Sequence, residues 1–518
     1  MNVAESVAKA ASLHLDGKIE DALEELHRAK DAGDHSAKLY YAIGHLQFEL
    51  GQFAAAASTY EDLQRLDHKS STAHYNLAVC LEKAGLWERA AAAFQKAIEM
   101  DPRRANAQLG LGVCLLHLQQ PESALHAFAA CLESQPFRET ALRGKALALQ
   151  LLNRCQEAAE LYQKLLSRDP DSEELLVNMI ALGIVEGDYE LVTQCARRLL
   201  DLQPQSPAAL EYLALAASGN RDYEAAVRFC AALVEAHPDH FPGWFNLGIA
   251  QQKLGRYSEA ADAYSQAVRV GPETVEAYLS LGTVLQELGR WEPARAAYEK
   301  ALSLDPDLKT ALWNLALLLE REQEFAEAGE LYSRLLEKHP EVQDAWFRLG
   351  YVRLQTGDFS GSIEALESCL TFQKKRPDVL LNIGIAYWKM GDLEAAKEVF
   401  RQILVWSPNA VEALRCLAAI ALERQDFEQA LKLHSRLLEI GESSAELLYN
   451  TGLLLQKAGR AKDAVRLYRQ AIAERPGFPE ALLNLGHALV SLGQPEEARS
   501  IWQAALQASP ELAENFLM

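Results

Sequence analysis

Apolar residues recur at helical spacing twice within residues 241–274, and each run has a marked end. The first run stops at Gly255, which can adopt the left-handed backbone conformation that ends a helix, and the second stops at Pro272, which cannot continue one. The loop between them is so short that the second helix must return antiparallel to the first. We therefore predict a helical hairpin. Its pattern is carried by Trp244, Leu247, Gly248, Ala260, Tyr264 and Ala267.

The same pattern returns along the whole chain at one fixed period, and we number it from Val3 as position 1. Position 8 is Gly or Ala in all repeats except one, and position 20 is usually Ala, which predicts close helix approach at both places. Position 24 usually carries a ring. Proline recurs in phase at Pro102, Pro136, Pro170, Pro204, Pro238, Pro272, Pro306, Pro340, Pro408, Pro476 and Pro510. We predict fifteen contiguous repeats over residues 3–512.

This signature resembles the tetratricopeptide repeat, a helix–turn–helix unit whose length, about 34 residues, equals the spacing of these prolines. The resemblance implies an all-α, right-handed superhelical solenoid of about fifteen such units, each packed only on its neighbours. We expect repeats 1 to 5 at residues 3–172, divergent repeats 6 and 7 at 173–240, repeats 8 to 15 at 241–512, and a short tail at 513–518.

The divergent segment places Ile180 and Val192 where close helix approach favours small residues. We expect either a local change of superhelical pitch across residues 173–240 or a compensating small residue nearby. In repeat 7, Arg221 replaces the turn glycine and a glycine stands at Gly219 instead. The apolar tail, with Phe516, Leu517 and Met518, favours self-association or simple shielding by a frayed last turn.

Composition narrows the partner classes. The net charge of −21 disfavours nucleic acid and anionic membranes, because phosphate would be repelled overall. No stretch approaches 18 apolar residues, and the N-terminal stretch does not read as a signal peptide, so we expect a cytoplasmic protein without membrane insertion. The eight cysteines form no CxxC pair and share positions with Ala and Leu of other repeats, as reduced core thiols do.

We expect no enzyme and no cofactor. The sequence contains no phosphate-binding loop, no HExxH and no GxSxG, and its histidines are scattered, so we predict neither catalytic residues nor a metal site. The fifteen repeats take up all but the first two positions and the tail at 513–518. That leaves no room for a separate catalytic domain.

The family resemblance implies that positions 2, 5, 6, 9, 12 and 13 of each first helix face the inner surface. Position 6 is rich in asparagine, which is unfavourable inside a helix and so needs another reason. An amide can donate to and accept from a peptide unit, similar to the asparagine ladder in the repeat arm of O-GlcNAc transferases. The alternative is that these amides bond a neighbouring repeat. The candidates are Asn76, Asn178, Asn246, Asn314, Arg348, Asn382, Asn450 and Asn484.

Aromatic residues stand beside them at positions 5, 9 and 12. Rings anchor interfaces disproportionately, so we predict a largely apolar peptide-binding groove, although each ring can instead pack on an adjacent helix. These residues are Tyr75, Phe245, Trp313, Phe347, Tyr351, Trp388 and Tyr449.

Position 2 is acidic in seven repeats, which complements the helix dipole and favours neutral or basic peptides. Relatives that clamp a C-terminal carboxylate use Lys at position 2 and Arg at position 6. Here Arg348 and Asn314 are present, but Asp344 stands in place of the lysine, and Leu279 and Thr283 replace other clamp residues. The acidic residues are Glu174, Glu276, Asp344, Asp378, Glu412, Glu446 and Glu480.

The sequence thus favours a non-catalytic scaffold that binds extended segments of other proteins in the inner groove. The alternative is a dedicated subunit that recruits substrates to a separate, glycosyltransferase-like enzyme or serves an envelope or secretion complex.

Overall fold

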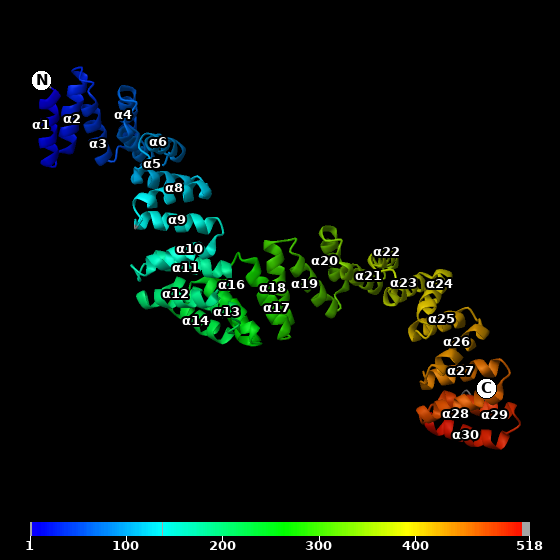
Figure 1. Cartoon of the computed structure of the whole chain (residues 1–518). Coiled ribbons are helices and arrows are strands. Elements are labelled where there is room, and N and C mark those ends of the chain that lie inside the picture. Colours follow the sequence, from blue (N-terminus) through cyan, green and yellow to red (C-terminus); the bar gives the residue numbers. More distant parts are fainter. Residues whose placement is uncertain (1–2, 137, 510–518) are drawn as a thin grey trace. The chain divides into compact units, whose positions relative to one another are not determined.

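The computed structural model of the chain describes residues 3–136 and 138–509. These residues form thirty α-helices and no strand, arranged as fifteen successive hairpins (Figure 1). The predicted all-α solenoid and its constant period are therefore confirmed. Pro510 and the apolar tail, on which the self-association hypothesis rests, lie outside the described residues. The chain divides into two compact units, residues 1–270 and 271–518, called unit 1 and unit 2 below.

Unit 1 contains the first eight hairpins, each made of an odd-numbered first helix and an even-numbered second helix. Its helices are α1 (Val3–Leu15), α2 (Ile19–Asp31), α3 (Ala37–Glu49), α4 (Phe53–Leu66), α5 (Ser71–Lys83), α6 (Trp87–Met100), α7 (Ala105–His117), α8 (Pro121–Ser134), α9 (Glu139–Leu151), α10 (Cys155–Leu166), α11 (Glu173–Glu186), α12 (Tyr189–Leu202), α13 (Pro207–Gly219), α14 (Tyr223–Ala236), α15 (Phe241–Lys253) and α16 (Tyr257–Val270).

Unit 2 contains the other seven hairpins. Its helices are α17 (Val275–Glu287), α18 (Trp291–Leu304), α19 (Lys309–Arg321), α20 (Phe325–Lys338), α21 (Gln343–Thr356), α22 (Phe359–Phe372), α23 (Pro377–Met390), α24 (Leu393–Trp406), α25 (Val411–Glu423), α26 (Phe427–Glu439), α27 (Ala445–Lys457), α28 (Ala461–Glu474), α29 (Pro479–Ser491) and α30 (Pro495–Ala508).

Every hairpin turn places position 15 in the left-handed region. Gly255 has φ +74°, as its predicted role requires, and ten of the fifteen turns use glycine there. Arg221 adopts the same conformation with φ +60°, so repeat 7 keeps the turn without glycine. Gly219 does not replace the turn glycine. It lies under the ring of Tyr189, where a Cβ atom would stand 2.5 Å from two ring carbons.

The small residue at position 8 makes room for the ring at position 24 of its own repeat. A Cβ atom on Gly282 would lie 2.6 Å from the Tyr298 ring, and one on Gly112 would lie 2.6 Å from the Phe128 ring. The sequence also predicts close helix approach at the alanine of position 20. These alanines are buried, but at both glycines the atoms nearest to an added Cβ belong to the ring.

The divergent repeat 6 is packed as tightly as the others. Ile180 and Val192 are both buried. Gly183 lies against the side chain of Val192, and a Cβ atom added to Gly183 would stand 2.9 Å from that side chain, too close for ordinary packing. A compensating small residue, the second of the two expected alternatives, therefore absorbs the extra volume. The change of pitch across residues 173–240 stays a prediction.

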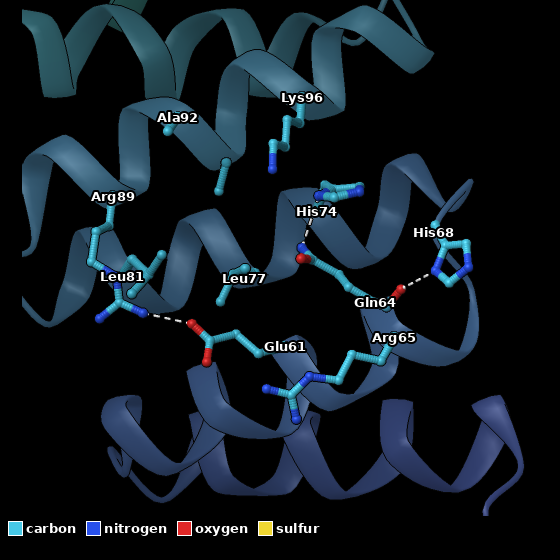
Figure 2. Close-up of a pocket in the computed structure, with 11 residues that line it drawn as sticks. Glu61, Gln64, Arg65, His68, His74, Leu77, Leu81, Arg89, Ala92 and Lys96 are labelled. Carbon is cyan, nitrogen blue, oxygen red and sulfur yellow. Dashed lines mark hydrogen bonds and ion pairs between the residues drawn. The ribbon is translucent and has the colours of Figure 1, made fainter.

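In each unit several pairs of successive first helices contact one another, as α5 does α7 and α21 does α23. No pair of successive second helices in the described residues packs as closely as these. The first helices therefore form the narrower, inner row, and the second helices spread apart on the outer side. Between two second helices, the intervening first helix lies at the bottom of an outer cleft. Figure 2 shows one such cleft, in which side chains of α4 and α6 face each other across α5.

Candidate peptide-binding surface

All fifteen predicted site residues lie on first helices, and therefore on the inner row. Unit 1 holds five of them, and these are Tyr75, Asn76, Asn178, Phe245 and Asn246. Unit 2 holds the other ten, and these are Trp313, Asn314, Phe347, Arg348, Tyr351, Asn382, Trp388, Tyr449, Asn450 and Asn484. Unit 2 is thus the richer half of the candidate surface.

Three of the asparagines are bonded inside the array. The amide nitrogen of Asn484 donates to the Tyr449 hydroxyl at 3.1 Å and to the Glu480 carbonyl at 2.9 Å. Asn76 and Asn314 each bond the tyrosine at position 24 of the preceding repeat. Burial raises the pKa of Tyr60 to about 12 and also raises the pKa of Tyr298, and the bonds from Asn76 and Asn314 oppose these rises. These amides link neighbouring repeats.

Four other asparagines bond no side chain or backbone group within residues 3–136 and 138–509. Asn450 is exposed and the remaining three are half-buried. Their amides keep their donors and acceptors available to a guest. They are Asn178 and Asn246 in unit 1, and Asn382 and Asn450 in unit 2.

Position 12 has a structural role that our sequence analysis missed. Its side-chain oxygen accepts a hydrogen bond from the tyrosine hydroxyl twelve residues later, as Gln286 does from Tyr298 at 3.1 Å. Burial raises the pKa of Tyr162, Tyr298, Tyr332 and Tyr468, so these phenols remain protonated donors. The signal available in the sequence is the recurrence of Gln or Glu twelve residues before Tyr. The other pairs are Gln150–Tyr162, Gln252–Tyr264, Glu320–Tyr332 and Gln456–Tyr468.

The predicted rings are half-buried and rest on other side chains. At position 5 the ring packs on the ring at position 24 of its own repeat, as Trp313 does on Tyr332 with centroids 5.8 Å apart. Trp388 donates its indole N–H to Glu423 of the next repeat at 2.9 Å. Each ring is therefore held in place while part of it stays accessible, which suits an interface anchor. The other packed rings are Tyr75 on Phe94, Phe245 on Tyr264, Tyr351 on Phe325, Tyr449 on Tyr468 and Phe347 beneath Arg376.

Arg348 takes the place of asparagine in repeat 11 and is fixed by a neighbouring carboxylate. Its guanidinium lies 2.6 Å from Glu320, which also accepts from Tyr332 at 2.9 Å. The Arg348 side chain keeps 41% exposure. The charge of Arg348 is already paired with Glu320, and position 2 of the same repeat carries Asp344 instead of a lysine. This repeat therefore lacks the pair of cations that a terminal carboxylate needs.

The acidic residues at position 2 fall into a paired set and an unpaired set. Arginines pair with Glu174, Asp378 and Glu446. The remaining four form no ion pair within the described residues, are exposed, and all lie in unit 2. They leave the inner row of unit 2 with unpaired negative charge, and they are Glu276, Asp344, Glu412 and Glu480.

The cysteines lie in the hairpin cores. Seven are buried, and Cys416 is half-buried. Burial raises the pKa of the Cys80, Cys114 and Cys230 thiols to about 12, so these groups remain protonated and unreactive near neutral pH. Within residues 3–136 and 138–509, no group of three or more His, Cys, Asp or Glu is placed to hold a metal ion. None of the described helices has the length and apolar character of a membrane-crossing helix.

Family models described as tetratricopeptide repeat match most of the chain. One matches residues 41–102, 83–129, 116–173, 187–241, 245–309, 279–340 and 314–377, and a second matches 353–420 and 455–514. None of the curated proteins matches the chain.

Several solved structures resemble the chain. A crystal structure of MamA protein is 24% identical and covers 34% of this chain and 96% of its own, with a TM-score of 0.30. The Naa15/Naa10 structure bound to HypK-THB is 13% identical, with 97% and 99% coverage and a TM-score of 0.35. The C-terminal part of a repeat protein from Cytophaga hutchinsonii is 18% identical, with 46% and 99% coverage and a TM-score of 0.43.

Proposed function

Because the chain belongs to the tetratricopeptide repeat family, we propose that it is a non-catalytic scaffold that holds extended segments of other proteins against its inner row of first helices. The observation that carries the proposal is the set of unbonded amides beside fixed, half-exposed rings in unit 2. Asn382 and Asn450 have no partner in the described chain, and Trp388 lies on the same helix as Asn382.

The unbonded and the bonded asparagines have different roles in this proposal. A peptide backbone needs a donor and an acceptor that are not already used, and Asn382 and Asn450 supply both. Asn314 and Asn484 bond tyrosine hydroxyls, so we assign them mainly to holding the repeats together. The rings would then provide apolar contact for the guest's side chains.

The electrostatics of the inner row favour neutral to basic guests. Four exposed and unpaired carboxylates of unit 2 face any segment bound there, so acidic peptides would be repelled. This preference is a second, separable property of the same surface.

A direct test selects binders to the full chain from a display library of random twelve-residue peptides and measures their affinity by fluorescence anisotropy. We expect neutral to basic peptides whose affinity falls about tenfold in the Asn382→Ala/Asn450→Ala variant, since each lost amide removes about 0.5–1.5 kcal/mol. Asn409→Ala, in an exposed turn, is the matched control and should leave the affinity unchanged. Selected peptides that bind both variants equally would contradict the proposal.

A further inference from the structure

A second surface lies on the outer side of unit 2, in the cleft between α24 and α26. Its volume is about 490 Å³, within the range of pockets that accommodate small ligands or several side chains. Leu414, Leu417 and Ile420 of α25 line the bottom, because the two second helices do not close over the first helix between them. Leu404 and Leu433 extend this apolar lining onto both walls.

The walls of this cleft carry an excess of positive charge. Lys397 and Arg401 stand one turn apart on α24, and Lys432 and Arg436 stand one turn apart on α26, so two basic stripes line the cleft. Arg424 adds a fifth cation at one end. The single carboxylate in the lining, Asp426, already caps α26 by accepting from the Gln429 N–H at 3.1 Å.

Three of these cations are unpaired. Glu394 neutralises Arg424 and lies 3.5 Å from Lys397. Arg401, Lys432 and Arg436 are exposed and form no ion pair within the described residues. The chain has a net charge of −21, so three unpaired cations around one apolar cleft make this surface locally basic in an acidic protein.

The corresponding cleft of unit 1 shows that this charge is not a property of every repeat. Figure 2 shows Arg89 of α6 bonded to Glu61 of α4 across that cleft, at 2.5 Å. Arg65 is likewise paired with Asp62 at 2.8 Å. Both clefts lie between two second helices above the first helix that separates them, but in the unit 1 cleft two of the cations are neutralised by carboxylates of α4.

We propose that the α24–α26 cleft binds a short acidic segment of a partner protein that carries one or two large apolar side chains. Carboxylates of the segment pair with Arg401 on one wall and with Lys432 and Arg436 on the other, and an apolar side chain reaches the leucines between them. Val405, which is 75% exposed one turn beyond Arg401 on α24, extends the apolar contact at the rim. A polyphosphate chain fits less well, because it carries no apolar side chain to reach the leucines of the lining.

This surface is independent of the inner row. The inner row of unit 2 favours neutral to basic segments and the outer cleft favours acidic ones, so the two surfaces select different partners. One hairpin stack can then hold two chains of opposite charge at the same time.

The experiment measures binding of a fluorescein-labelled peptide, Asp-Glu-Leu-Asp-Glu-Phe-Asp-Glu, to the full chain by anisotropy in about 0.15 M salt. We expect the affinity to fall at least about tenfold in Arg401→Glu/Lys432→Glu/Arg436→Glu, and to fall by an intermediate factor when the same residues become Gln. Replacing Leu and Phe of the peptide by Gly should weaken binding to the unaltered chain as well.

The matched control is Lys83→Glu/Lys96→Glu/Arg103→Glu, which reverses three exposed charges in unit 1 and changes the net charge equally. It should bind the peptide within about twofold of the unaltered chain. Equal losses in both variants, no loss in either, or no binding at all would overturn the proposal. So would tighter binding of an oligothymidine or of phosphatidylserine vesicles through the same three residues. Circular dichroism of all variants establishes that the helices remain folded.

Discussion

Two junctions between repeats bury the ring at position 24 in different ways, one with apolar neighbours and the other with hydrogen-bonding neighbours. In unit 1, Phe128 lies between Gly112 of its own repeat and Gly144 of the next, with Leu116 at position 12. In unit 2, the equivalent residues are Tyr298, Gly282, Asn314 and Gln286. We call these the apolar junction and the polar junction.

Both rings are fully buried, yet only the tyrosine hydroxyl requires partners. The polar junction supplies an acceptor from its own repeat and an amide from the next. The apolar junction removes the side chain at position 6 instead, so that the ring reaches the backbone of α9. The comparison indicates that the residue type at position 6 depends on the ring of the preceding repeat. An asparagine at position 6 therefore does not by itself indicate a binding site.

The largest expected effect follows from Gly144→Asn. A Cβ atom at Gly144 would stand 2.5 Å from Cε1 of Phe128, and the ring cannot withdraw because Gly112 lies behind it. We expect local destabilisation of about 3 kcal/mol from overpacking. Hydrogen–deuterium exchange of α8 and α9 measures it, with α18 and α19 as the internal control, since repeat arrays open locally. Unchanged protection of α8 and α9 would contradict the packing argument.

The next effect is that of Phe128→Tyr. The new hydroxyl would point to the Leu116 side chain, which cannot accept a hydrogen bond, so we expect a loss of about 2 kcal/mol for an unsatisfied buried group. Adding Leu116→Gln supplies the acceptor found in the polar junction and should recover part of the loss. A double variant as unstable as Phe128→Tyr, by the same exchange measurement, would show that the two positions are not coupled.

Tyr298→Phe should cost about 1 kcal/mol, because it removes one hydroxyl shared by two amides. This difference should shrink at high pH. The folded protein holds the pKa of Tyr298 above its usual value of 10.0, so the unfolded chain loses this proton first, and the native form loses stability as the pH rises past 10. Thermal unfolding of both proteins between pH 8 and pH 11 checks the sign. A gap that widens with pH would be the contrary result.

The smallest stability effect concerns the asparagines themselves. Asn382→Ala should stabilise α23 by a few tenths of a kcal/mol, because the amide has no partner and alanine is the better helix former. Asn314→Ala should destabilise α19 slightly, because Tyr298 loses a partner. In the peptide-binding assay the order should reverse, with Asn382→Ala weakening binding more than Asn314→Ala. Equal effects of the two variants on both measurements would remove the distinction between bonded and available amides.

The period alone predicted the fifteen hairpins and their turns, because each helix end is marked by residue types that recur at the same position of every repeat. Gly255 and Pro272 marked the helix ends as expected. The side-chain partner of an asparagine could not be predicted in the same way, because it lies in the preceding repeat and is found at different positions there, as Tyr298 is for Asn314 and Tyr449 is for Asn484. Tyr298 and Asn314 are bonded, whereas Asn178 follows Tyr162 at the same spacing and has no partner in the described chain.

The basic outer cleft could not be predicted either. Its cations are spread over residues 397–436 and never form a run, so no local charge pattern points to them. They converge only because two second helices face each other across α25. The sequence shows the number of charges, and the fold determines which of them meet.

Because every unit has the same length, the chain can lose or gain a whole unit without changing the register of the positions that follow. Deleting one whole unit returns every later side chain to an equivalent neighbour, with a ring again opposite position 6. The local cost then depends only on whether the newly matched ring and amide suit each other, as Tyr298 would against Arg348 after loss of residues 309–342. Such an array can be shortened or extended by whole units at the level of the gene while each surviving hairpin keeps its contacts.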